Sequence, residues 1–81
     1  MKKNESDLWI EGAVRAFGNM YHYWAKRYET GSEFGIDGGR ISKLRVERKG
    51  CVVCSYERGW EQRPVDEDTQ FVLEIILHGN N

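Results

Sequence analysis

The sequence has little of what usually marks a disulfide framework, a membrane segment or a coat for nucleic acid. It holds two cysteines and one proline in 81 residues, and its net charge is −1. It has no apolar run of the roughly 18 residues that a transmembrane helix needs, and its charged N-terminus lacks the apolar core of a secretory signal. A nearly neutral chain is not expected to coat nucleic acid, although it can carry a local basic patch. We therefore expect a cytoplasmic protein without membrane contact, with a flexible tail at residues 1–7 and a single domain at residues 8–81.

The two cysteines, Cys51 and Cys54, have the CxxC spacing of a redox pair or of half a zinc site. They bracket two valines in a segment that reads as a β-strand. Residues three apart on a strand lie about 10 Å apart and face opposite sides, whereas a disulfide needs Cα atoms about 5.5 Å apart. The two histidines, His22 and His78, also lack the close spacing of metal ligands. The pattern predicts two ordinary strand cysteines, no metal site and no cofactor.

Catalytic patterns are missing as well. The serines at positions 32, 42 and 55 have no nucleophile elbow around them. The glycine-rich segment 34–44 contains neither GxGxxG nor GK followed by Ser or Thr, and it leads into a strand rather than into a helix. The acidic residues are spread along the chain without ligand spacing. We expect a protein that is not an enzyme.

The order of the apolar patterns predicts a small α+β fold. Strand-like runs cover residues 8–14, 21–28, 41–48 and 51–57, with turns at Gly18–Asn19 and Lys49–Gly50. Residues 58–64 read as a polar loop. A helix is expected from about residue 66 to residue 78, capped by Asp66 and ended at His78–Gly79. These elements predict a four-stranded antiparallel β-meander of two hairpins, with one C-terminal α-helix packed on the sheet.

Alternation along the predicted strands assigns side chains to faces, but it leaves one register open. A two-residue loop in the second hairpin would place Val53 beside Val46, and a three-residue loop would place Val52 there. One residue of slip exchanges the faces of a strand, so either Val53 or Tyr56 can be the buried residue. In the aromatic strand, one face carries His22, Trp24, Lys26 and Tyr28, and the other carries Tyr21, Tyr23, Ala25 and Arg27.

The predicted helix is apolar around most of its surface. Its polar residues Gln70, Glu74 and His78 lie four apart and form one narrow stripe. A helix on a one-sided sheet needs an apolar stripe of only about 100°. Either the sheet curls around the helix, which we favour in so small a domain, or part of the helix meets another chain, as in a homodimer.

Two sets of residues are candidates for a binding surface. The first is a protein-binding set in which apolar anchors and an arginine are exposed on the glycine-rich connection, together with the tryptophan that follows the fourth strand: Phe34, Ile36, Arg40 and Trp60. In the plainer alternative, Phe34 and Ile36 tuck under the sheet, residues 37–39 supply positive φ angles, and Trp60 is a lid on the core.

The second set combines positive charge with aromatic rings, as in proteins that hold single-stranded nucleic acid. Its plain alternative is a solvated strand face, and Glu47 and Glu57 dilute its charge. The members of this set are Lys26, Arg27, Arg40, Lys43, Arg45, Tyr21 and Tyr23.

Four segments carry a resemblance to a known family: WIEG at residues 9–12, YWAK at 23–26, SEFGIDGGRISKL at 32–44 and YERGW at 56–60. On these segments the chain resembles a family of short uncharacterised bacterial and phage proteins, classed as a domain of unknown function. The resemblance implies no activity and no site. It implies an accessory gene of a phage or mobile element, a class in which small non-enzymatic inhibitors of host defence are common. We therefore predict a small binding protein that contacts a protein partner, with nucleic-acid binding as the alternative.

Overall fold

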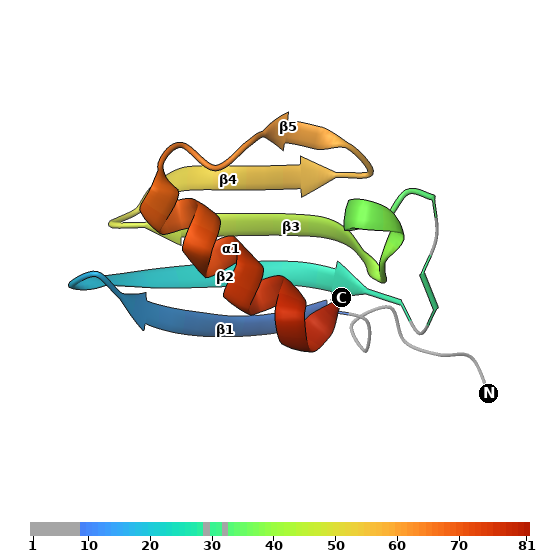
Figure 1. Ribbon diagram of the computed structural model, residues 1–81, viewed down its shortest axis with the longest axis horizontal. Coiled ribbons are helices and arrows are strands. Elements are labelled where there is room, and N and C mark those ends of the chain that lie inside the picture. Colours follow the sequence, from blue (N-terminus) through green and yellow to red (C-terminus); the bar gives the residue numbers. More distant parts are fainter. Residues whose placement is uncertain (1–8, 29, 32) are drawn as a thin grey trace.

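The protein folds into one antiparallel sheet with a single helix across one of its faces (Figure 1). The computed structural model describes residues 9–28, 30–31 and 33–81, so the predicted tail at residues 1–7 lies outside the described residues. The strands pair in sequence order and the helix follows the last of them, which confirms an α+β fold with an antiparallel sheet and a C-terminal helix. The elements are β1 (Trp9–Ala16), β2 (Asn19–Arg27), the short 3-10 helix η2 (Ile36–Gly38), β3 (Ile41–Arg48), β4 (Cys51–Glu57), β5 (Trp60–Gln62) and α1 (Glu67–Asn80).

The sheet has five strands, and the prediction of four is wrong. Residues expected to form a polar loop instead pair with β4, with Tyr56 opposite Trp60. The turn before β5 is tight because Arg58 adopts a positive φ of 59° and the N–H of Glu57 donates to the carbonyl of Gly59 at 2.8 Å. A strand of three residues is too short for alternation to reveal it, which is why the sequence pattern missed it.

Two tight turns set the lengths of the other hairpins. The predicted turn at Lys49 and Gly50 is confirmed, with φ values of 55° and 79°. The first turn uses Phe17 and Gly18, at 54° and 76°, and so lies one residue before the predicted Gly18–Asn19. Positive φ at both central residues is the geometry that matches the twist of a two-residue hairpin. A positive φ is rare for phenylalanine.

A β-bulge decides the register that alternation left open. The turn between β3 and β4 has two residues, but a register shift follows, and Val46 lies opposite Cys54 rather than opposite Val53 or Val52. Val53 is the extra residue of the bulge. Because a bulge lets neighbouring residues face the same side, Val53, Cys54 and Tyr56 are all buried.

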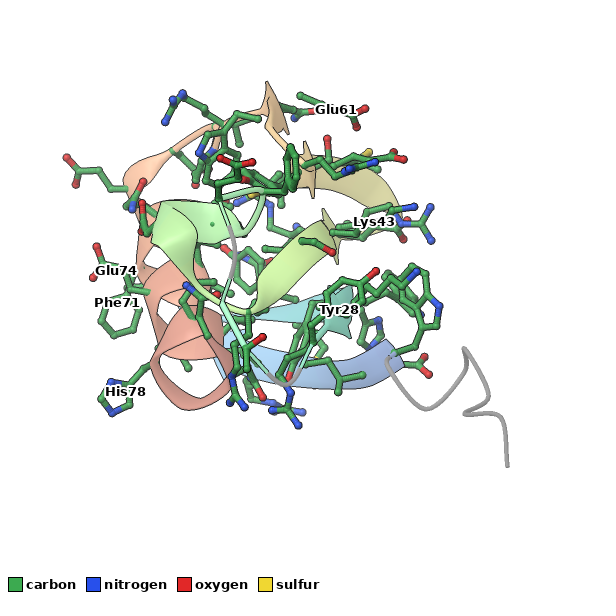
Figure 2. All side chains as sticks on the ribbon, turned by 90° about the vertical axis from the view of Figure 1, so that its right-hand side faces the viewer. Tyr28, Lys43, Glu61, Phe71, Glu74 and His78 are labelled. Atoms are coloured by element: carbon green, nitrogen blue, oxygen red, sulfur yellow. The ribbon has the colours of Figure 1, made fainter. Side chains whose placement is uncertain are left out.

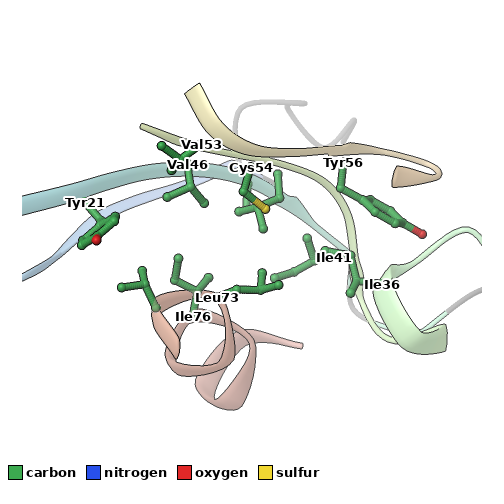
Figure 3. Packing of buried hydrophobic residues seen from close by; sticks show 12 residues of the cluster. Tyr21, Ile36, Ile41, Val46, Val53, Cys54, Tyr56, Leu73 and Ile76 are labelled. Carbon is green, nitrogen blue, oxygen red and sulfur yellow. The ribbon is translucent and has the colours of Figure 1, made fainter. Parts of the chain in front are cut away.

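The hydrophobic core lies between the sheet and α1 (Figure 3). The apolar residues of α1 that are buried against the sheet are Val72, Leu73 and Ile76. The outer residues Phe71 and Ile75 stay exposed, Phe71 by 50%. The sheet therefore does not cover the whole apolar stripe, although the ring of Phe17 in the first turn lies edge-on to Phe71, with 5.5 Å between centroids.

The helix begins as predicted and ends later than predicted. Asp66 caps α1, and its carboxylate accepts a hydrogen bond of 2.8 Å from the backbone N–H of Thr69. The predicted end at Gly79 is wrong, because Gly79 lies within the helix and α1 runs to Asn80. Asparagine rather than glycine closes the last turn, since Asn81 is the C-terminal capping residue.

The glycine-rich connection between β2 and β3 is compact and is tied to the end of the helix. Asp37 and Gly38 have positive φ as predicted, whereas Gly39 does not. The side chain of Asn81 accepts a hydrogen bond from the first N–H of β3 at 3.0 Å and donates one to the carbonyl of Ile36 at 2.8 Å. Ile36 is 1% exposed. This segment therefore closes one end of the core.

The cysteines follow the plain prediction. Cys51 is exposed, Cys54 is buried, and both are free thiols. Burial raises the pKa of the Cys54 thiol to about 11. Among the residues that the structure describes, no helix is long and apolar enough to cross a membrane.

Candidate functional site

Helix α1 covers one face of the sheet, and among the residues that the structure describes no element covers the other face (Figure 2). We call the uncovered side the open face. In Figure 2 the helix and its outer residues Phe71, Glu74 and His78 lie on one side of the sheet, and Lys43 extends from the opposite side. Strand alternation and register place ten further open-face residues beside one another: Trp9, Glu11, His22, Trp24, Lys26, Arg45, Glu47, Ser55, Glu57 and Glu61.

Trp24 stands at the centre of the open face and is held on three sides. Its indole N–H donates to Glu11 on β1 at 3.1 Å. The guanidinium of Arg45 on β3 lies 4.8 Å from the ring, which is a cation–π arrangement. His22 meets the indole edge-on, with 6.4 Å between centroids. The indole is therefore fixed in position before any partner arrives.

Two neighbouring hollows are bordered by residues of the open face. The tryptophan hollow, of about 380 Å³, is bordered by Trp9, Trp24, Lys43, Arg45, Glu57 and Glu61. The cationic hollow, of about 530 Å³, is bordered by Lys26, Tyr28, Phe34, Lys43, Glu57 and Arg58. Lys43 and Glu57 border both, so the two hollows lie next to each other.

Most charges around the tryptophan hollow are paired within the chain. Lys43 lies 3.4 Å from Glu57, and Arg45 lies 3.4 Å from Glu47. These pairs are partly exposed, and such pairs contribute little to stability. Positive and negative groups therefore alternate over this part of the face, and neither sign dominates.

The cationic hollow brings three basic side chains close to aromatic rings. Lys26 lies directly opposite Lys43 in the register of β2 and β3. Lys26 is only 8% exposed, and its ammonium lies 5.5 Å from the centre of the Tyr28 ring. Arg58 comes from the turn before β5, and its guanidinium lies over the ring of Phe34 at 4.6 Å. Two lysines and an arginine thus converge on one hollow with aromatic walls.

Comparison with known proteins gives a family for the chain. Residues 8–81 match the profile of DUF7678, described as a domain of unknown function. The chain belongs to this family. No curated protein and no solved structure matches it. The DUF7678 description carries no site, so the assignment of a site in this member depends on its geometry.

In this DUF7678 chain, the residues of the predicted protein-binding set differ in exposure. Phe34 is 44% exposed and borders the cationic hollow. Ile36 is buried in the core and offers no surface to a partner. Trp60 is half-buried and packs edge-on against Tyr56 at 5.0 Å, and it borders the core as a lid would. Arg40 is half-buried where the glycine-rich connection enters β3. Its carbonyl accepts a hydrogen bond of 3.0 Å from the backbone N–H of Tyr28, the residue that follows β2.

The predicted nucleic-acid set is divided by the sheet. Lys26, Lys43 and Arg45 lie on the open face, and Arg40 lies at the end of the sheet. The remaining residues lie on the helix side: Tyr21 is fully buried, Tyr23 is half-buried, and Arg27 donates to Asn80 of α1 at 3.1 Å. The sheet therefore separates both tyrosines from the lysines that they were expected to accompany.

Sequence reasoning missed several residues of the DUF7678 open face. Alternation placed Trp24, Lys26 and Tyr28 on one face, but it did not show which face the helix covers. Trp9 joins them only through the register of β1 and β2, where it lies opposite Lys26. Arg58 enters through the turn that creates β5. Among the described residues, no group of three or more His, Cys, Asp or Glu side chains could hold a metal ion.

Proposed function

We propose that this member of DUF7678 is a non-enzymatic binding protein and that a protein partner docks on its open face. The observation that carries the proposal is the pair of tryptophans on the sheet face that no described element covers. Trp9 is 45% exposed, and Trp24 is half-buried and held by its neighbours. Tryptophan, tyrosine and arginine are enriched at the energetic centres of protein interfaces. The rigid rings of tryptophan and tyrosine bury much area with little loss of side-chain freedom. A fixed aromatic centre with a polar surround has the anatomy of such an interface.

The charges of the open face favour a protein over nucleic acid. Four carboxylates, those of Glu11, Glu47, Glu57 and Glu61, are interspersed with its cations. A nucleic-acid strand carries a negative charge at every phosphate, so it would meet these carboxylates wherever it crossed the face. A protein surface can present charges of both signs in a complementary order.

An accessory or inhibitor-type role in a phage or mobile element is part of this proposal, and its support is the family resemblance alone. A small chain with this face would act by occupying the surface of its partner. The tagged protein is used in a pull-down from its native host, and the same pull-down is repeated with Trp24→Ala. The comparison tests whether any captured partner depends on the open face.

A displayed random-peptide library tests the binding surface directly. The full chain is the target, and the affinities of selected peptides are then measured for Trp24→Ala and for Phe71→Ala, an exposed aromatic on the helix side. We expect Trp24→Ala to weaken binding by roughly tenfold or more and Phe71→Ala to leave it unchanged, with circular dichroism showing that both variants fold. Dependence on Phe71 instead of Trp24, or the absence of any selected peptide, would overturn the proposal.

A further inference from the structure

We propose that a second copy of this chain pairs with the outer edge of β1 in antiparallel orientation, so that two five-stranded sheets become one continuous sheet. The inference goes beyond the proposed function and does not depend on it. Its basis is the contrast between the two edges of the sheet, together with the placement of Glu11 and Arg15 on either side of Ala13.

The two edges of the sheet differ in the features that prevent pairing with other chains. β1 and β5 form its two borders (Figure 1). β5 has three residues, and a register shift interrupts its pairing with β4, and short or bulged strands are means by which proteins protect an edge. β1 has eight residues that all pair with β2 in one unbroken register, and it contains neither proline nor lysine. Among the residues that the structure describes, no strand pairs with the outer edge of β1.

The outer edge of β1 presents its backbone groups in a fixed order. In an antiparallel pair, residues that exchange both backbone hydrogen bonds alternate with residues that exchange none, and a two-residue turn is closed by a bonded pair. The turn at Phe17 and Gly18 therefore directs the N–H and C=O groups of Glu11, Ala13 and Arg15 away from β2. The side chains of these residues are exposed and lie on the open face by alternation. A strand added at this edge would bond to their backbone groups.

A second copy fits this edge because the edge is complementary to itself. When two copies of β1 run antiparallel about a two-fold axis at Ala13, Glu11 of each copy lies directly opposite Arg15 of the other. Opposite charges directly across neighbouring strands attract each other, and the symmetry makes the same ion pair twice. Gly12 of each copy lies opposite Val14 of the other on the helix side, so no two large side chains meet beside the axis. An extended segment of another protein has no such built-in match.

Glu11 is held in place for this pairing. One oxygen of its carboxylate accepts the hydrogen bond of 3.1 Å from the indole N–H of Trp24, and the other oxygen can accept from an arginine of the second copy. A carboxylate that is already oriented loses less side-chain freedom when it forms an ion pair.

Pairing through β1 closes the assembly at two copies. Each chain has one long edge, which the dimer uses, and the edge that remains at either end is the short β5. A two-fold interface uses the same surface on both copies and does not propagate. The axis is perpendicular to the sheet, so the open faces of both copies lie on the same side. Trp9 and Trp24 of both copies would then belong to one surface.

Sedimentation equilibrium of the full chain and of two charge variants tests the inference. The wild type should be a dimer at micromolar concentrations. Glu11→Arg places arginines opposite arginines, and Arg15→Glu places glutamates opposite glutamates, so the dimer of either variant alone should dissociate roughly tenfold more readily or worse. An equimolar mixture of the two variants should dimerise again, because each charged residue then meets the opposite charge.

A backbone variant tests the edge itself. Ala13→Pro removes an N–H that points away from β2, and proline is tolerated on an edge strand in this orientation. The dimer loses this hydrogen bond twice, so we expect it to weaken by roughly tenfold or more. Ala13→Ser keeps the N–H and should dimerise like the wild type. Circular dichroism shows which variants fold, and if Ala13→Pro does not, the mixed charge variants still decide the question.

The contradicting outcomes are distinct. A wild type that stays monomeric up to the millimolar range would overturn the inference. A dimer that the charge variants do not weaken, or that is lost in Phe71→Ala, would place the interface elsewhere and would overturn it too. Assembly beyond two copies would contradict the closure at β5. Peptide binding by a monomeric protein would overturn this inference and leave the proposed function standing.

Discussion

The guanidinium of Arg58 lies over the ring of Phe34, 4.6 Å from its centre. The two residues are distant in the chain, one in the glycine-rich connection and the other in the turn before β5. Their contact joins two segments of the chain. Strand alternation in the sequence does not show that these segments are neighbours. It also places a positive charge at the border of the cationic hollow.

Replacing Phe34 with leucine tests the contribution of this contact to binding. Leucine keeps apolar cover over the same place but removes the π face beneath the guanidinium. A partly exposed cation–π contact contributes about 0.5–1 kcal/mol, so we expect a peptide that contacts Arg58 to bind roughly two- to fivefold more weakly. Isothermal titration measures the change. Equal affinities for the wild type and Phe34→Leu would show that Arg58 does not need the ring.

The N-terminal cap of α1 predicts that the stability of the protein depends on pH. A hydrogen bond from Thr69, together with one from Arg48 at 3.0 Å, lowers the pKa of Asp66 from 3.8 to about 2. A carboxyl with a pKa lowered by folding stabilises the protein above its ordinary pKa and loses that contribution as pH falls through the folded value. We therefore expect part of the stability to disappear between about pH 4 and about pH 2.

The variant Asp66→Asn isolates this contribution, since asparagine is also a good N-terminal cap but does not titrate. Its midpoint of urea unfolding should lie below that of the wild type at neutral pH, and the two midpoints should approach each other in acid. A constant gap between the two proteins across this range would contradict the assignment.

The two thiols should differ sharply in reactivity. The thiolate is the reactive form, and burial raises the pKa of Cys54 to about 11, whereas Cys51 is exposed. At about pH 8, the folded protein should release about one equivalent of coloured thiolate from a chromogenic disulfide reagent, and the unfolded protein about two. Cys51→Ser should abolish the rapid reaction, and Cys54→Ser should preserve it. Rapid modification of Cys54 in the folded protein would show that the core opens around it.

Gly12 should be one of the least tolerant positions of β1. It lies opposite Tyr23, and a Cβ atom added there would come within 2.6 Å of the tyrosine oxygen. Because a packed aromatic ring must shift to make room, Gly12→Ala should destabilise the protein by about 1–3 kcal/mol. Gly79→Ala is the matched control. A Cβ there meets nothing within 4 Å, and a glycine replaced within a helix should stabilise it by about 0.4–1 kcal/mol. Equal effects of the two changes in denaturant unfolding would contradict the packing of Tyr23 on Gly12.

The sequence pattern predicted the elements that local chemistry determines. β3 and β4 have the predicted bounds, because strong alternation and the Lys49–Gly50 turn act within a few residues. The capping role of Asp66 was likewise predictable, since it depends on the next turn of chain. The bulge at Val53 was not predictable, because it depends on how a strand packs against a helix that comes later in the sequence.

The candidate site was harder to predict, for a physical reason. Alternation assigns the side chains of a strand to two faces, but it does not show which face the helix covers. Tyr21 and Trp24 are both aromatic residues of β2, yet one is fully buried and the other stands on the open face. Which face is covered depends on the path of the chain after β5, a strand that the pattern itself did not reveal.

Amide chemical shifts of the labelled full chain, measured while a selected peptide is added, test the central claim most directly. We predict that the largest changes fall on open-face residues of β2 and β3, around Trp24 and Lys43, with a further change at the side chain of Arg58. The helix amides near Phe71 and Ile75 should stay in place. Changes concentrated on α1, with Trp24 and Lys43 unaffected, would show that the partner binds the helix side and would contradict the account.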